Sequence, residues 1–195
     1  MARPREFDRD EALSSALDAF WSKGYEATSM SDLMAAMKLQ KGSIYAAFGD
    51  KKSLFIESLQ KYSDMMYAHY KMVFEEEPSA YAGIERFLTK EIVQMTTDCT
   101  RRKGCFTNNT MVEMGPHCED IKEVLMQHSN RTETFFTGKI QEAQTAGDIR
   151  DDILAEDLAI EMIVMMSGIT SDSKTGLCPS RTQKVTDIFL KMLQA

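Results

Sequence analysis

The sequence predicts an all-α protein, and three observations support this class. Apolar residues recur three and four positions apart, which places them on one face of a helix. Alternating apolar and polar runs joined by Asn-Gly or Asp-Gly turns, which would predict β-hairpins, are missing from the sequence. Glycine and proline residues fall at several joins between the periodic segments. With 195 residues, 43% of them hydrophobic, the chain is long enough for one large or two small domains.

The first two helices are predicted from their caps. Asp8 and Glu11 form a capping-box pattern, and Gly24 is a typical end for the helix that follows. The apolar face of this helix consists of Leu13, Ala16, Leu17 and Phe20. Thr28 or Ser29 begins a second helix of about two turns, because either hydroxyl can accept a hydrogen bond from a free amide. Its apolar face consists of Leu33, Met34 and Met37.

The third helix is predicted over residues 41–48, where Ile44 and Phe48 face inward and Gly49 ends the helix. The other face is small and polar, as a helix in a DNA major groove about 12 Å wide requires. That face consists of Gln40, Lys41, Gly42, Ser43, Tyr45, Ala46 and Ala47. Three short helices with a tight turn between the second and third are the minimum for a helix-turn-helix unit. Gly42 costs a helix about 1 kcal/mol relative to alanine, which indicates either close approach of another backbone or phosphate, or a tight entry into the helix.

A long fourth helix is predicted from Asp50, its cap, to residue 77, before Pro78 interrupts it. At 1.5 Å per residue it would reach roughly 40 Å, enough to connect two domains. The remaining helices are predicted at residues 80–97, 107–114, 119–146, 155–171 and 181–194. We therefore expect a helix-turn-helix domain at residues 1–52 and a larger helical domain at residues 53–195.

The motif Thr28-Ser29-Met30-Ser31-Asp32-Leu33, followed by residues 41–51, resembles the signature of the tetracycline-repressor (TetR) family of bacterial transcription regulators. The resemblance extends from about Arg5 to Leu59. It implies three N-terminal helices that read DNA, a long linking helix, and a divergent helical domain for ligand binding and dimerisation. The expected function is a ligand-responsive regulator, a repressor, that binds a palindromic double-stranded DNA operator as a homodimer and is released by a small apolar or amphipathic effector.

The resemblance also implies DNA contacts. Thr28 and Ser29 would bind phosphate at the start of the second helix, and Tyr45 would reach a phosphate through its hydroxyl. Further contacts would be Arg3 and Arg5 in an arm against the minor groove, Gly42 and Ser43 beside the DNA, and Lys51 on the backbone.

Base recognition would depend on Gln40 and Lys41. Many relatives have a polar or aromatic residue at Ala46 and Ala47, whose methyl groups cannot donate hydrogen bonds here. Gln40 suits adenine and Lys41 suits guanine. The alternatives are an N-cap role for Gln40 and a solvated or phosphate-facing charge for Lys41.

The last two helices are candidates for the dimer interface. Residues 160–169 are apolar almost all the way round, and residues 185–193 form a regular apolar stripe. The family pairs its last two helices into a four-helix bundle between two chains, although residues 160–169 could instead belong only to the monomer core. The candidate interface residues are Met162, Met165, Met166, Ile169, Val185, Ile188, Phe189 and Met192.

The chain contains 15 methionines, eleven of which follow residue 60. Thioethers adapt to irregular shapes, so they could line a cavity for apolar ligands, or they could simply fill the core. The candidate ligand-binding residues are Phe87, Cys105, Met111, Met126, Phe135 and Met165.

Cys105 suggests an alternative function. It follows Arg101, Arg102 and Lys103 and lies near the start of a predicted helix, conditions that favour a reactive thiolate. A thiol-based redox or electrophile sensor is one interpretation, and a packed structural cysteine is the other. The segment 117–119 (His-Cys-Glu) predicts no metal site, because neighbouring residues point to different faces of a helix.

Composition limits the function classes. Net charge is −7, which by itself argues against DNA binding. Residues 1–60, however, hold eight basic and nine acidic side chains, so most of the acidity lies in residues 61–195. The sequence shows no catalytic constellation, so we expect neither enzyme activity nor a cofactor, and a helical protein-binding adaptor is the other class considered. No secretory signal or apolar run of about 18 residues is present, so we expect a cytoplasmic protein without a membrane partner.

Overall fold

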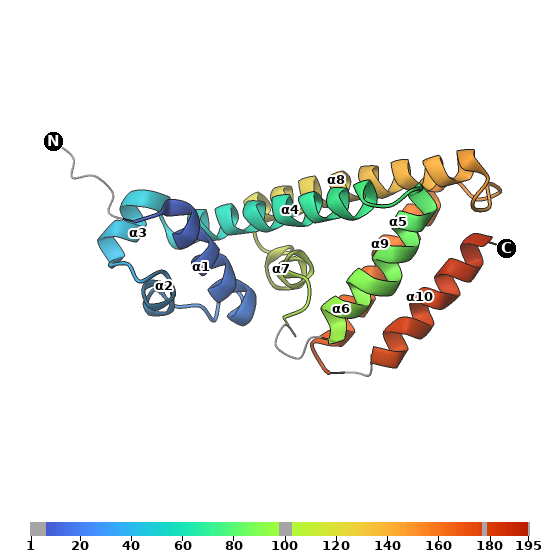
Figure 1. Cartoon of the computed structure of the whole chain (residues 1–195). Helices are drawn as coiled ribbons and strands as arrows, with labels where there is room; N and C mark the ends of the chain where they lie inside the picture. The colour runs from blue at the N-terminus through green and yellow to red at the C-terminus, as the bar shows by residue number, and fades with distance from the viewer. Residues whose placement is uncertain (1–6, 98–102, 177–178, 195) are drawn as a thin grey trace.

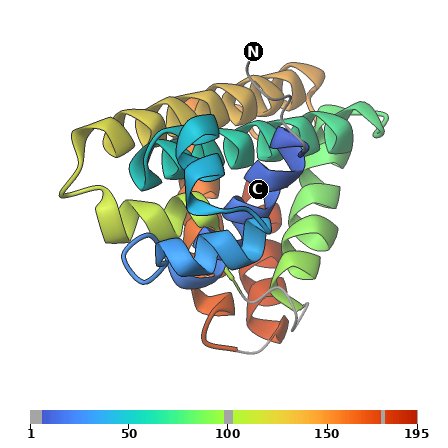
Figure 2. The same ribbon diagram turned by 90° about the vertical axis from the view of Figure 1, so that its left-hand side faces the viewer.

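The computed structural model describes residues 7–97, 103–176 and 179–194. All regular secondary structure within these ranges is helical, which confirms the predicted class (Figure 1). The first three helices form a unit at one end of the molecule, and helix α4 runs from this unit into a larger helical half. Figure 2 views the same arrangement from the N-terminal end, with α2 and α3 in front. No helix in the described part is both long and apolar enough to cross a membrane.

The N-terminal helices begin and end close to where the sequence predicts. They are α1 (Arg9–Lys23), α2 (Met30–Met37), α3 (Lys41–Phe48) and α4 (Lys51–Glu75). Asp8 accepts hydrogen bonds from the amides of Asp10 and Glu11, and Asp50 accepts one from the amide of Ser53. These caps satisfy amides that the helices leave free, which is why short polar residues mark the starts so reliably.

The larger half contains α5 (Ala80–Arg86), a π-helical turn (Phe87–Glu91), α6 (Ile92–Thr97), α7 (Phe106–Met114), α8 (Glu119–Ala146), α9 (Ala155–Ser173) and α10 (Pro179–Gln194). The prediction of one regular helix over residues 80–97 was wrong at the π-helical turn. The buried residues Ile84, Leu88 and Ile92 are spaced by four, so apolar periodicity gives no sign of the wider turn between them.

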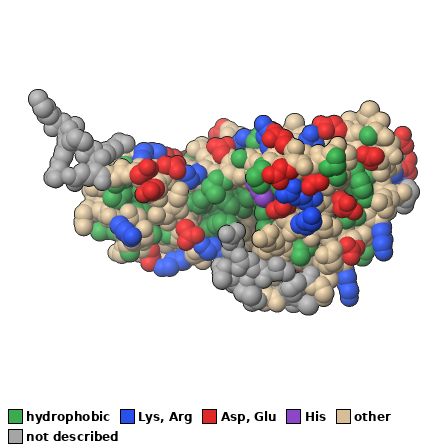
Figure 3. All heavy atoms as spheres, in the orientation of Figure 1, with side chains coloured by type: hydrophobic (Ala, Val, Ile, Leu, Met, Phe, Trp, Pro, Cys, Tyr) green, Lys and Arg blue, Asp and Glu red, His purple; other side chains and the backbone are tan. Residues whose placement is uncertain are grey.

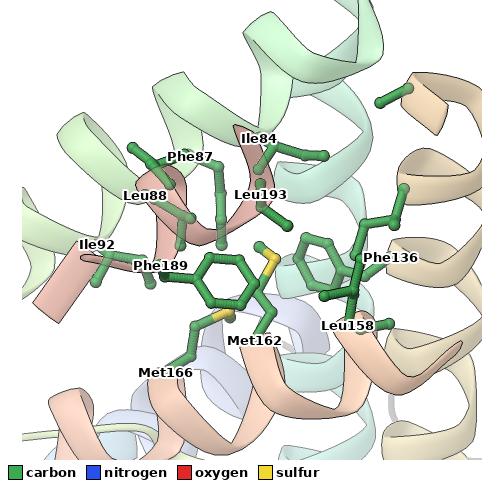
Figure 4. Packing of buried hydrophobic residues seen from close by; sticks show 14 of the residues in the cluster. Ile84, Phe87, Leu88, Ile92, Phe136, Leu158, Met162, Met166, Phe189 and Leu193 are labelled. Carbon is green, nitrogen blue, oxygen red and sulfur yellow. The ribbon is translucent and has the colours of Figure 1, made fainter. Parts of the chain in front are cut away.

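The larger half has its own apolar core. Figure 4 shows α5, α6, α8, α9 and α10 directing side chains toward one another, with Phe189 between Met166 and the residues of the π-helical turn. Phe136 of α8 and Phe87 have ring centroids 5.4 Å apart, and both are fully buried. Helix α10 thus packs against the core of its own chain through Phe189, Leu190 and Leu193.

A second core joins the N-terminal unit to α7 and the first turns of α8. Phe55 of α4 makes edge-to-face contacts with Phe20 of α1 and Phe106 of α7, at centroid distances of 4.9 and 5.5 Å. Met114, Ile121 and Leu125 are buried in the same cluster. The predicted boundary after residue 52 therefore cuts across shared packing, because α4, α7 and α8 all contribute to the N-terminal core.

Candidate nucleic-acid interface

Helix α3 presents the face that the sequence predicts. Ile44 and Phe48 are buried against the N-terminal core, whereas Lys41, Gly42 and Tyr45 are exposed. Gln40 occupies the N-cap position with an extended backbone, but its side chain makes no capping hydrogen bond. The N-cap alternative for Gln40 is therefore confirmed for its position, and its exposed side chain is not used as the cap.

Gly42 faces open space. A Cβ atom placed on this glycine would meet no other atom within 4 Å. The helix therefore does not need glycine here for packing within the protein. The surface beside Gly42 is therefore open to a molecule outside the chain.

Two lysines flank this face. The Nζ atom of Lys41 lies 5.6 Å from the ring centroid of Tyr45, which is itself 42% exposed. Lys51, at the start of α4, has its Nζ atom 4.3 Å from the ring centroid of Tyr25. Contact with a ring face holds a cation in place without pairing it with a carboxylate. Lys38 adds an exposed cation in the turn between α2 and α3, where the sequence motif did not single it out.

Thr28 does not match its predicted role. Its side chain is fully buried, and its hydroxyl donates a 2.6 Å hydrogen bond to the carbonyl of Gly24. The prediction that Thr28 presents its hydroxyl to phosphate was therefore wrong, because the hydroxyl closes the turn between α1 and α2. Ser29 is exposed, but its hydroxyl is engaged in a capping box with Asp32 at the start of α2. Arg3 and Arg5 lie outside the described residues.

The surface charge is mixed in sign. On the face in Figure 3, Lys, Arg, Asp and Glu side chains are interspersed, and hydrophobic side chains gather where the N-terminal unit meets the larger half. Several cations of the N-terminal half are paired, such as Arg9, which contacts Glu57 at 2.6 Å, and Lys52, which contacts Asp120. Lys41 and Lys51 are therefore the main cations at α3 and the start of α4 that face a ring rather than a carboxylate.

Half of the predicted dimer-interface residues belong to the core of their own chain. Met162, Met166, Ile169 and Phe189 are all at most 8% exposed, so their assignment to an interface was wrong (Figure 4). Met165, Val185 and Met192 are partly buried against the same core. Helix α9 is apolar all round because one side packs inward while another side faces solvent.

The apolar residues that α9 and α10 leave exposed are different ones. Ile160, Val164 and Ile188 are 42%, 65% and 67% exposed, and Ile188 is the predicted interface residue that stays on the surface. Gly168 continues the Ile160 and Val164 row by one turn, and a Cβ atom there would meet nothing within 4 Å. The spacing of four along 160, 164 and 168 was the sequence signal that could have found this face.

The predicted ligand-binding residues do not converge on one cavity. Phe87 is fully buried, Phe135 and Met165 pack against the same core, and Met111 and Met126 are 48% and 55% exposed. The prediction that Met111 and Met126 line an interior cavity was therefore wrong. A groove of about 450 Å³ does lie between α4 and α8, and Phe135 is the one predicted ligand residue among those that line it.

That groove has aromatic and cationic walls. Its lining includes Tyr67 of α4 and Arg131, Phe135 and Lys139 of α8. The Arg131 guanidinium lies 3.7 Å from the Tyr67 ring centroid and donates to Asp64 at 2.6 Å. Lys139 pairs with Glu142, which also lines the groove, so both cations of the groove contact carboxylates of the chain.

Cys105 is half-buried at the N-cap of α7, as its sequence position suggested. The Tyr62 hydroxyl donates to Sγ at 3.6 Å, and the Thr107 hydroxyl lies 3.0 Å from it. Burial raises the pKa of Tyr62 well above its ordinary value, so this phenol stays protonated. Lys103 pairs with Asp18 rather than with the thiol, and Arg101 and Arg102 lie outside the described residues. The contacts that the structure describes thus favour the packed-cysteine interpretation. Within the same residues, no group of three or more His, Cys, Asp or Glu side chains could hold a metal ion.

A histidine links α4 to α8 beside the groove. The Nδ1 atom of His128 lies 2.8 Å from the hydroxyl of the buried Ser63. Burial, followed by the charge of Arg131, lowers the pKa of His128 from its ordinary value of 6.5. Folding therefore favours the neutral ring.

This shift predicts a pH-dependent loss of stability. Below about pH 6.5 the unfolded chain takes up a proton at His128 that the folded chain resists, so the free energy of unfolding should fall as the pH drops toward the folded pKa. Above this window His128 is neutral in both states and contributes no pH dependence. Urea midpoints at pH 7.5 and 5.5 should differ less for His128→Gln than for the wild type. The matched control is His117→Gln at an exposed position, and an equal loss in all three proteins would contradict the assignment.

Two family models match the chain. "Bacterial regulatory proteins, tetR family" matches residues 12–57, and "Tetracyclin repressor-like, C-terminal domain" matches residues 83–189. The first range covers α2, α3 and most of α1, and the second covers more than half of the chain.

Curated and solved relatives are similar along nearly the whole length. The HTH-type transcriptional repressor ComR of Escherichia coli (strain K12) is 28% identical over 191 residues, 97% of this chain and 90% of ComR. The uncharacterised HTH-type regulator YezE of Bacillus subtilis (strain 168) is 27% identical over 194 residues, 99% of this chain and all of YezE. A cysteine variant of the TetR-family regulator CifR, solved with 26-base-pair operator DNA, is 31% identical with a TM-score of 0.85, covering 97% of this chain and 98% of CifR.

Proposed function

Because the chain belongs to the TetR family of bacterial transcription regulators, we propose that it is a repressor that binds a palindromic operator as a homodimer. A small molecule bound in its C-terminal half releases it from DNA. The observation that carries the proposal is the exposed face of α3 around Gly42, where a Cβ atom would meet nothing within 4 Å. The curated relatives that are named as repressors, and CifR solved with operator DNA, support the same role. That role is one of binding, not catalysis.

The proposed DNA contacts follow from what α3 and α4 expose. Gln40 and Lys41 read adenine and guanine in the major groove, and Ser43, Tyr45 and Lys51 contact phosphates. Gly42 allows the backbone of α3 to approach the DNA closely. Arg3 and Arg5 supply a basic arm. We assign DNA binding to residues 1–52, and ligand binding and dimerisation to residues 53–195.

The proposed dimer interface is the exposed face of α9 and α10 rather than the buried methionines. Ile160, Val164 and Ile188 supply apolar contact, and Gly168 allows close approach of helices. This face of α9 also carries the exposed residues Asp157 and Glu161, whereas α10 carries Lys184 and Lys191. Opposite charges therefore favour packing of α9 on one protomer against α10 of its partner.

Release from DNA follows from the geometry of α4. This helix of 25 residues spans about 38 Å and carries both Lys51 at its start and Tyr67 in the wall of the groove. A ligand that binds better to one position of α4 shifts the separation of the two α3 helices in the dimer. Operator affinity then falls by the ratio of the ligand's affinities for the two states.

The experiment is a selection of operator sequences from random double-stranded DNA with the purified protein. We expect an enriched palindrome with half-sites about one helical turn apart, and an affinity that decreases steeply with salt because phosphate binding releases counterions. Failure to enrich a palindrome would count against the repressor, and salt-insensitive binding would favour the protein-binding adaptor.

A further inference from the structure

Helix α7 belongs to the C-terminal half of the sequence, yet it lies against the N-terminal unit. Figures 1 and 2 both show α7 beside α1 and the turn that follows it. Glu113 of α7 contacts the backbone of this turn.

The carboxylate of Glu113 holds two consecutive backbone amides of that turn. The amide of Tyr25 donates to Oε2 at 3.0 Å, and the amide of Glu26 donates to Oε1 at 2.9 Å. These amides lie between α1 and α2 and have no helical partner, so the carboxylate satisfies both of them. The contact joins positions 88 and 87 residues apart in the sequence.

The backbone conformation of Gly24 and its missing side chain leave room for the Glu113 carboxylate. Its φ of +84° is one that residues other than glycine rarely adopt, and a Cβ atom there would lie 2.8 Å from Oε2 of Glu113. The carbonyl of the same glycine accepts the hydroxyl of the buried Thr28, which closes the turn. The turn is thus folded around the carboxylate.

The segment before α7 adds two contacts to α1. The indole N–H of Trp21 donates to the carbonyl of Gly104 at 3.1 Å, and Lys103 pairs with Asp18. Asp18 and Trp21 are three positions apart in α1, so both contacts fall on one face of this helix. Movement of α7 therefore pulls on α1 and on the turn together.

The turn leads directly to the proposed DNA contacts. The Tyr25 ring, whose backbone Glu113 holds, supports the Lys51 cation at 4.3 Å and packs edge-on against Phe55 at 4.9 Å. Three residues after Glu26, Ser29 caps α2. One carboxylate on α7 thus sets the position of Lys51 and the start of α2.

We propose that Glu113 is a positioning residue for operator binding, which couples α7 to the helix-turn-helix unit through the amides of Tyr25 and Glu26. This inference rests on the proposed function, because the contact acts on residues assigned there to DNA. Loss of this contact would loosen the turn and weaken the contact of Lys51 with phosphate.

The test compares Glu113→Ala and Glu113→Gln with the wild-type dimer. Hydrogen exchange at the amides of Tyr25 and Glu26 should become at least about tenfold faster in Glu113→Ala, while amides in the interior of α1 keep their protection. Operator affinity should fall about tenfold. Glu113→Gln retains one acceptor oxygen and should give an intermediate loss in both measurements, which also keeps the test decisive if the alanine variant folds poorly.

The matched control is Glu123→Ala on α8, where the carboxylate is exposed and accepts a hydrogen bond only from Gln127 among the described residues. It removes the same negative charge, which by long-range electrostatics would raise DNA affinity slightly. Unchanged or tighter operator binding by Glu113→Ala would overturn the positioning role and leave the repressor function intact. Failure of the wild type to bind any operator would instead reject the repressor function itself.

Discussion

Val164→Glu should convert the dimer to a monomer and lower operator affinity at least about a hundredfold. Val164 is 65% exposed at the middle of the proposed interface, and the exposed residues Asp157 and Glu161 lie about two turns and one turn before it on α9. In a two-fold interface each substitution occurs twice, so two carboxylates would be buried where the wild type has apolar side chains. Such burial costs several kcal/mol, and each 1.4 kcal/mol is a factor of ten in the equilibrium constant.

Sedimentation and operator titration would measure the two effects separately. The variant should bind an isolated half-site as weakly as the wild-type monomer does, because its α3 is intact. Val112→Glu is the matched control, since Val112 is 83% exposed on α7, away from the proposed interface. A Val164→Glu protein that remains a dimer at the same concentrations would reject this face as the interface.

Gly42→Leu should abolish specific operator binding, with a loss of about a hundredfold or more, while the fold remains stable. The space in front of Gly42 is empty in the free protein, so the new side chain meets nothing there. It would collide only with DNA. Gly42→Ala should separate the effect on helix stability from the effect on DNA binding. It should stabilise α3 by up to about 1 kcal/mol and still weaken operator binding.

Thermal unfolding of both variants would measure the stability of the fold, and operator titration would measure the affinity for DNA. Ala146→Gly and Ala146→Leu are the controls, because Ala146 is exposed at the end of α8 and is not among the residues that line the groove. They should leave operator affinity unchanged. Wild-type operator affinity in Gly42→Leu would show that this face of α3 does not approach DNA.

Much of the fold could be predicted because its signals are local. Asp8, Ser29 and Asp50 cap helices within three residues of themselves, so a single sequence window contains the interaction. The face of α3 likewise follows from Ile44 and Phe48, four positions apart. The predicted helix starts and the predicted outer face of α3 agree with the structure for this reason.

The parts that could not be predicted depend on contacts distant in the sequence. Residues 160–169 of α9 are apolar almost all the way round, so composition cannot distinguish Met162, which packs inward, from Val164, which faces solvent. The hydrogen bonds from the turn to Glu113 depend on how α1 and α7 meet. The buried position of Thr28 was missed for another reason, because the motif does not show that its hydroxyl donates to the carbonyl of Gly24.

The shared N-terminal core limits how this protein could be recombined with its relatives. Phe106 and Met114 of α7 and Ile121 of α8 complete the core that begins with Phe20 and Phe55. A chimaera joined at residue 52 would keep the recognition helix but replace the core residues that α4, α7 and α8 supply. A functional chimaera with a new effector specificity would have to keep these α7 and α8 residues together with the DNA-binding unit. They follow that unit by more than 50 positions in the sequence.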